Sequence, residues 1–150
     1  MAMQEFYESF YVRQENISII TLLPEQYVFL IQNKEFESKL SPRMKISKDM
    51  FVFGCSTALR YSDLMNICIK DIQEQPSGHF LRIDSLKTGT EVNIKLPSFA
   101  IEIFKKYSRH KGLRQKLFNP LALSAFNMNL KKIGRKAGWT NSIGKYRSMN

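Results

Sequence analysis

Cysteine, histidine and long apolar runs are scarce in this chain of 150 residues. Its two cysteines, Cys55 and Cys68, have apolar neighbours and form no C-x-x-C pair. We expect them to be reduced core residues of a cytoplasmic protein rather than partners in a disulfide. The two histidines, His79 and His110, are isolated in the sequence. We therefore predict neither a metal site nor a cofactor.

No stretch approaches the roughly 20 apolar residues that cross a bilayer. The first residues, M-A-M-Q-E-F-Y-E, lack the basic start and apolar stretch of a signal peptide. We therefore expect no membrane partner. A chain of this length is typical of one domain that buries its own core.

Acidic residues are rare in the second half of the chain. Residues 1–75 carry 8 basic and 10 acidic side chains, whereas residues 76–150 carry 15 basic and 3 acidic ones. The formal net charge of +10 therefore comes from the second half. Such an imbalance predicts a polyanionic partner. A solvated basic surface is the alternative interpretation.

The hydrophobic pattern predicts an α+β fold, mostly helical with one small antiparallel sheet. Residues 1–20 are expected to be a tail or linker, with the domain over 21–150. Helices are expected at about 21–35, around Met50, after Pro97 and at about 123–137, with a charged connection at 34–48. Strands are expected from about Ile69, at 80–84 and at 91–96, where apolar and polar residues alternate.

The stretch F-V-F-G-C-S-T-A-L-R-Y-S-D-L-M-N-I-C-I-K-D-I, residues 51–72, is the one around which we interpret the chain. It predicts a helix, a tight corner that holds Arg60, and a short helix that starts near Ser62 and Asp63. A guanidinium at such a corner points outward and offers a fork of donors that fits a phosphate. The alternative is a structural ion pair between Arg60 and Asp63.

This stretch resembles the first catalytic box of the tyrosine recombinases, the phage integrase family, whose usual form is T-G-L-R followed by a small residue and an acid. Ala58 stands where the family usually has glycine. The resemblance implies that Arg60 holds the scissile phosphate of DNA. The positions that match are Thr57, Leu59, Arg60, Ser62, Asp63, Leu64, Ile67 and Asp71.

A second resemblance follows 27 residues later, in S-L-K-T-G-T-E-V-N-I-K-L-P. It is similar to the family's β-hairpin, whose lysine is the general acid that protonates the leaving 5′ oxygen. The resemblance gives that role to Lys87. A mobile ammonium at a turn suits it, since an alkoxide leaves poorly without a proton. Taken alone, a lysine in a K-T-G turn is most often only solvated. We expect Arg60 and Lys87 to lie near one another on one face.

The region L-F-N-P and the helix after it, with A-G near its end, also resemble the family, so that the likeness covers about residues 20–140. Four basic side chains lie opposite the apolar stripe of that helix and are expected to follow DNA phosphates. A solvated helix face is the alternative. The four are Lys131, Lys132, Arg135 and Lys136.

The family's H-x-x-R box and nucleophilic tyrosine have no counterpart in the sequence. His110 and Arg114 are one residue too far apart, and Tyr146 comes too early. We therefore expect a truncated catalytic domain that lacks its C-terminal half and is inactive alone.

The resemblance implies metal-free cutting and rejoining of DNA through a phosphotyrosyl intermediate, for integration or excision of a mobile element. Double-stranded DNA and self-association on DNA, as a tetramer in the intact family, are the implied partners. Two alternatives remain open: a non-catalytic, regulatory DNA-binding module, and a protein-interaction domain for an acidic partner.

Overall fold

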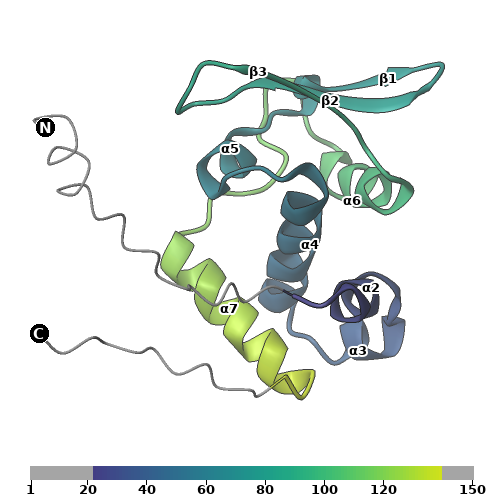
Figure 1. The fold of residues 1–150 in the computed structure, drawn as a ribbon, viewed down its shortest axis with the longest axis vertical. Coiled ribbons are helices and arrows are strands. Elements are labelled where there is room, and N and C mark those ends of the chain that lie inside the picture. Colours follow the sequence, from purple (N-terminus) through teal and green to yellow (C-terminus); the bar gives the residue numbers. More distant parts are fainter. Residues whose placement is uncertain (1–21, 140–150) are drawn as a thin grey trace, which may run out of the picture.

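A computed structural model describes residues 22–139 of the chain. This part is α+β, with a small sheet across one end and helices beneath it (Figure 1). The predicted fold class is confirmed at this level. The helices are α2 (Pro24–Gln32), α3 (Lys34–Ser38), α4 (Pro42–Thr57), α5 (Tyr61–Asn66), α6 (Ser98–Ser108) and α7 (Leu123–Lys136), with a 3₁₀ turn, η1 (Ile69–Asp71). The strands are β1 (Ile72–Gln75), β2 (Gly78–Asp84) and β3 (Glu91–Lys95).

The three strands form an antiparallel sheet in the order β1-β2-β3. Leu81 in the middle strand pairs with Ile72 on one side and Ile94 on the other. Leu81 is completely buried, because its side chain points from the sheet toward the helices. The β1–β2 turn passes through Gly78 at φ 132°, a backbone conformation that glycine alone adopts easily.

Helix α4 is the centre of the core and contacts α2, α5, α6 and α7. Ser41 caps its first turn, with its hydroxyl 3.4 Å from the Met44 amide that donates to it, and Pro42 occupies the first turn. Phe53 is fully buried and meets Phe118 edge to face, with ring centroids 5.7 Å apart. Truncating such a ring to alanine typically costs about 3–5 kcal/mol of stability.

Helices α3, α4 and α6 are also joined by a buried polar cluster. Lys48 and Asp49 of α4 are both about 96% buried, since each is 4% exposed. Lys48 Nζ lies 2.9 Å from the Glu37 carboxylate of α3, and Lys106 Nζ of α6 lies 2.7 Å from the Asp49 carboxylate. The Tyr107 hydroxyl donates to Asp49 at 2.8 Å. The paired charges satisfy one another, which makes their burial tolerable.

Several boundaries predicted from the sequence are wrong. The helix expected at about 21–35 is broken at Asn33, and most of the expected connection 34–48 is helical, in α3 and the first turns of α4. The strand expected from Ile69 begins at Ile72, because a 3₁₀ turn comes first. In that turn the Asp71 carboxylate accepts from the Cys68 amide at 2.8 Å.

The expectation of two core cysteines also fails, since Cys55 is exposed and Cys68 is half-buried. Cys55 is exposed although Val52 and Phe53 in the same helix are buried. Both thiols are free. The predicted tail at residues 1–20 and the Tyr146 region lie outside the described residues.

Candidate functional site

The corner predicted around Arg60 is formed by the end of α4 and the start of α5. Ala58 ends α4 in a left-handed conformation, with φ 52° and ψ 27°, which turns the chain sharply. Arg60 then occupies the N-cap position of α5 in an extended conformation, and its side chain is exposed. The helix therefore starts at Tyr61, slightly before the predicted Ser62 and Asp63. Arg60 has no ion pair with Asp63 among the contacts of residues 22–139.

Asp63 is instead buried, with 5% of its surface exposed, and binds the second candidate segment. Its Oδ1 accepts a hydrogen bond from the backbone amide of Leu86 at 3.0 Å. Leu86 immediately precedes Lys87 in the turn between β2 and β3. That turn lies over α5 in Figure 1. The first turn of α5 therefore fixes the hairpin end that carries Lys87 to the helix that carries Arg60.

Lys87 itself is exposed, as are its neighbours Thr88 and Gly89. Gly89 has φ 66°, and its amide donates to the Ser85 carbonyl at 2.7 Å, so that the turn is closed by its own backbone. Arg60 and Lys87 thus both reach solvent from segments held together by Asp63.

Tyr61, next to Arg60, fixes the corner to the part of the chain that leads into α7. Its hydroxyl donates to the Leu121 carbonyl, and its ring packs on Phe126 of α7 with centroids 5.1 Å apart. Burial raises the pKa of the Tyr61 hydroxyl, which therefore stays protonated as a donor at neutral pH. Sequence reasoning missed the roles of Tyr61 and Asp63, which depend on partners 60 and 23 residues away.

All four basic residues predicted for the outer face of α7 are exposed. The opposite side of the helix holds Phe126 and Ile133, which are buried, so the predicted inner stripe is correct there. The basic residues occupy the second half of α7, which runs away from α5 in Figure 1. Lys136 comes ten residues after Phe126, about 15 Å further along the helix axis. The four are Lys131, Lys132, Arg135 and Lys136.

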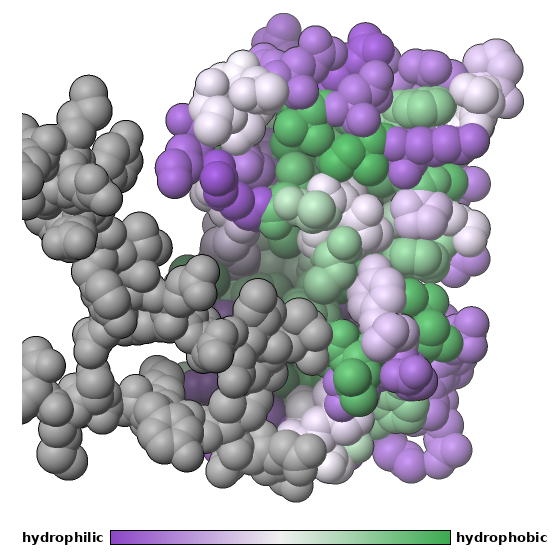
Figure 2. Space-filling model, viewed as in Figure 1, coloured by the Kyte–Doolittle hydropathy of each residue, from purple (hydrophilic) through white to green (hydrophobic). Residues whose placement is uncertain are grey.

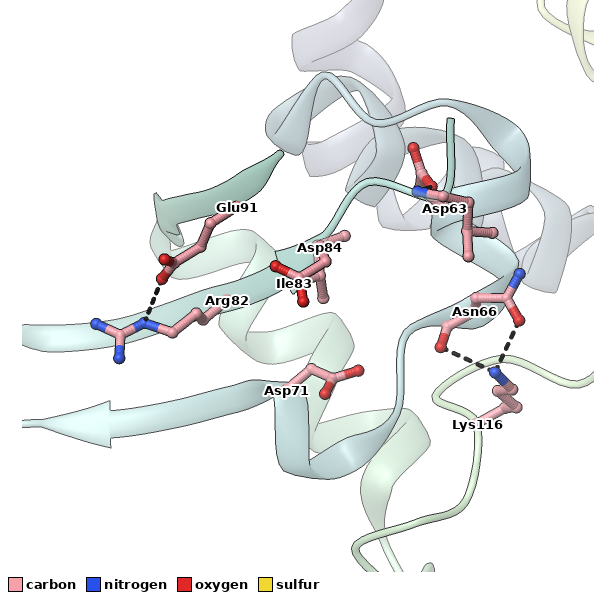
Figure 3. A pocket seen from close by; sticks show the side chains of 9 residues that line it. Asp63, Asn66, Asp71, Arg82, Ile83, Asp84, Glu91 and Lys116 are labelled. Carbon is pink, nitrogen blue, oxygen red and sulfur yellow. Dashed lines mark hydrogen bonds and ion pairs between the residues drawn. The ribbon is translucent and has the colours of Figure 1, made fainter. Parts of the chain in front are cut away.

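A hollow of about 560 Å³ lies between α5, η1 and strands β2 and β3 (Figure 3). Neither Arg60 nor Lys87 lines it. Its lining includes the carboxylates of Asp63, Asp71, Asp84 and Glu91. These would repel a phosphate, so we assign the candidate site to the exposed surface around Arg60 and Lys87 rather than to this hollow.

Two cations border that hollow, and both are already engaged. Arg82 Nε lies 3.5 Å from the Glu91 carboxylate, and Lys116 Nζ donates to the Asn66 side chain at 2.8 Å. Within residues 22–139, no three His, Cys, Asp or Glu side chains are grouped so that they could hold a metal ion. None of the helices in the same residues is long and apolar enough to cross a membrane.

No protein-family model, curated protein or solved structure matches this chain. The likeness to the tyrosine recombinases therefore rests on the motif residues quoted from the sequence.

Proposed function

We propose that this chain is part of the catalytic domain of a tyrosine recombinase, and that it presents Arg60 and Lys87 to a backbone phosphate of duplex DNA. Arg60 would stabilise the charge that develops on the phosphate, and Lys87 would protonate the leaving 5′ oxygen. The observation that carries the proposal is the hydrogen bond between Asp63 and the Leu86 amide. It joins the two motif segments, which are far apart in the sequence.

The size of the basic surface favours DNA over a small phosphate ligand. The basic residues of α7 begin several residues beyond Phe126, which packs beside the Arg60 corner. A ligand that meets both the corner and the far end of this basic face, at Lys136, must extend over about 15 Å. Duplex DNA does so within about five base pairs, at 3.4 Å per step along each strand.

The exposed charges of α7 would contribute affinity without reading bases, because lysine and arginine on a helix surface contact phosphates. The proposal includes assembly of several copies on DNA, as in the intact family. The nucleophilic tyrosine and second arginine of the family have no counterpart in this sequence, so the proposal gives this chain phosphate binding and proton donation only.

Binding of short duplex DNA by the 150-residue chain tests the proposal, with Arg60→Ala and Lys87→Ala compared against Lys70→Ala. Lys70 is an exposed lysine on η1 and serves as the charge-matched control. Both site variants are expected to bind more weakly than the control, since each removes a phosphate contact. Equal binding by all three variants would refute the proposed site. Tighter binding of an acidic protein than of DNA would favour a protein-interaction domain.

A further inference from the structure

The outer side of α4 carries an apolar surface that no described segment covers. Two adjoining hollows, of about 330 and 620 Å³, share Cys55 as a lining residue. The first extends from Phe51 and Ala58 of α4 to Phe126 of α7. The second extends from Cys55 to Phe99 of α6. Among the described residues that line them, none is charged.

Figure 2 shows hydrophobic side chains below the hydrophilic edge of the sheet, and the two hollows on α4 join at Cys55. A contiguous apolar surface of this kind usually marks a place where another segment or molecule binds. Two segments of this chain lie outside the described residues, 1–21 and 140–150. Their compositions differ sharply.

Residues 1–21 are rich in large apolar side chains, whereas residues 140–150 contain only Ile143, Tyr146 and Met149. The charges differ too. The first segment has three glutamates against Arg13 alone, whereas the second has Lys145 and Arg147 and no acid. An acidic segment is attracted to a chain of net charge +10, and a basic one is not. The large apolar residues of 1–21 are Met1, Met3, Phe6, Tyr7, Phe10, Tyr11, Val12, Ile17, Ile19 and Ile20.

The position at which residues 1–21 join the described fold also favours this segment over residues 140–150. Leu22, the first described residue, itself lines the larger hollow. Ile19 and Ile20 are therefore tethered within two or three residues of it. Ten residues upstream of Leu22 span up to about 33 Å when extended, at 3.3 Å per residue.

We propose that residues 1–20 dock along this surface of their own chain, with Ile17, Ile19 and Ile20 over the hollow beside Cys55. The segment covers the outer side of α4 and completes the core there. Its glutamates come to lie toward the exposed Arg60. Arg60 does not line the smaller hollow, but its neighbours in the sequence, Leu59 and Tyr61, do.

The rate at which an uncharged maleimide modifies Cys55 measures this docking directly. The full 150-residue chain is compared with the double variant Ile19→Asp, Ile20→Asp, and each thiol is followed by peptide mass spectrometry. The matched control is Ile143→Asp, Tyr146→Asp, which places the same charges in the other segment. Cys68 serves as the internal reference, because it lies in neither hollow.

Cys55 should react roughly tenfold faster or more in the Ile19/Ile20 variant than in the unmodified chain, while Cys68 keeps its rate. The control should match the unmodified chain, and the rates should not change over a roughly hundredfold range of protein concentration. Equal Cys55 rates in all three proteins would overturn the proposal. Protection that appears only at high concentration would assign the surface to a second copy, and release by the control would assign it to residues 140–150. Either result also overturns it.

Discussion

Ala58 holds the corner before Arg60 in a backbone conformation that suits glycine better. A side chain at φ 52° in the left-handed region costs about 1 kcal/mol or more, because Cβ approaches the following carbonyl. We predict that Ala58→Gly raises the free energy of unfolding by roughly 0.5–1 kcal/mol, after the entropy that glycine loses on folding. Urea denaturation measures it. Ala100→Gly, at a buried right-handed position in α6, should be destabilising instead.

Asp63 accepts the hydrogen bond that holds the turn carrying Lys87. This contact gives a second prediction about a single residue. Asp63→Ala should leave the Leu86 amide without its partner, so that this amide exchanges with solvent at least about tenfold faster. Asp63→Asn keeps a side-chain oxygen at the same place and should preserve most of the protection. Hydrogen exchange followed by NMR gives the readout. Unchanged exchange in Asp63→Ala would mean that the β-hairpin holds the turn unaided.

The proposed chemistry gives a third prediction. The 150-residue chain should form no covalent bond with a nicked suicide DNA substrate, whereas a chain extended through an H-x-x-R box and a late tyrosine should form one. In the extended chain Arg60→Ala should slow adduct formation by about 10² or more. Lys87→Ala should be comparably slow, yet recover with a 5′-thiol leaving group, which needs no proton.

Adduct appears as a DNA-sized shift on a denaturing gel. Equal damage by Lys87→Ala with oxygen and sulfur leaving groups would show that this lysine is not the acid. Adduct formed by the 150-residue chain itself would place a nucleophile within the sequence that the proposal does not recognise.

At the scale of elements, the sheet and α7 could be predicted because their patterns are simple. Glu91–Lys95 alternates between exposed and half-buried positions. Gly138, at φ 79°, directly follows Ala137, the C-cap residue of α7. Helix α4 begins in a stretch that resembles a polar connection, because its buried side includes Ser47, Lys48 and Asp49. Only tertiary partners, Glu37 and Lys106 among them, make those positions part of the core.

The candidate site was likewise predictable where it depends on local sequence and unpredictable where it depends on tertiary contacts. The exposed places of Arg60 and Lys87 follow from local turn chemistry, which the sequence displays. The contacts that hold their segments, through Asp63 and Tyr61, join residues distant in the sequence, and no local pattern indicates them.

The basic face of α7 gives a prediction that belongs to the element as a whole. Changing its four basic residues to glutamine should lower the slope of log affinity against log salt by about 3–4, if each contacts one phosphate. Titration of duplex DNA between about 50 and 200 mM salt measures the slope. The control changes four other exposed cations, Lys39, Lys70, Lys105 and Arg109. Equal loss of slope in the two sets would mean that α7 is only part of a diffuse basic surface.

At the scale of the whole molecule, the buried cluster makes stability depend on pH on both sides of neutrality. Burial raises the pKa of Glu37, but the hydrogen bond and charge of Lys48 outweigh it, so the pKa lies below its usual value. The stabilisation from Glu37 is therefore present at neutral pH and is lost as the pH falls below about 4.3. Burial, and then the Asp49 carboxylate, raises the pKa of Tyr107 well above its usual value. That stabilisation is complete below about pH 10 and is lost as the pH rises further.

The free energy of unfolding should thus form a plateau across neutral pH and fall toward both extremes. Tyr107→Phe should flatten the alkaline side and leave the acid side unchanged, as urea denaturation over a pH series would show. Tyr27, whose pKa burial raises to about 12, keeps a smaller alkaline slope in that variant. An alkaline side as steep as before would exclude Tyr107 as its main source.

The polar cluster around Lys48 and Asp49 also restricts which substitutions can accumulate during evolution. Losing Lys48 alone would leave the buried Asp49 and the half-buried Glu37 with one cation fewer, and breaking a buried pair in this way typically costs about 3–5 kcal/mol. Removing the whole set for apolar side chains of similar volume can be nearly neutral. Each single step is therefore penalised, while the combined exchange is permitted. In descendants of this chain, the positions now held by Glu37, Lys48, Asp49, Lys106 and Tyr107 should accordingly co-vary as one block, inherited whole or replaced whole.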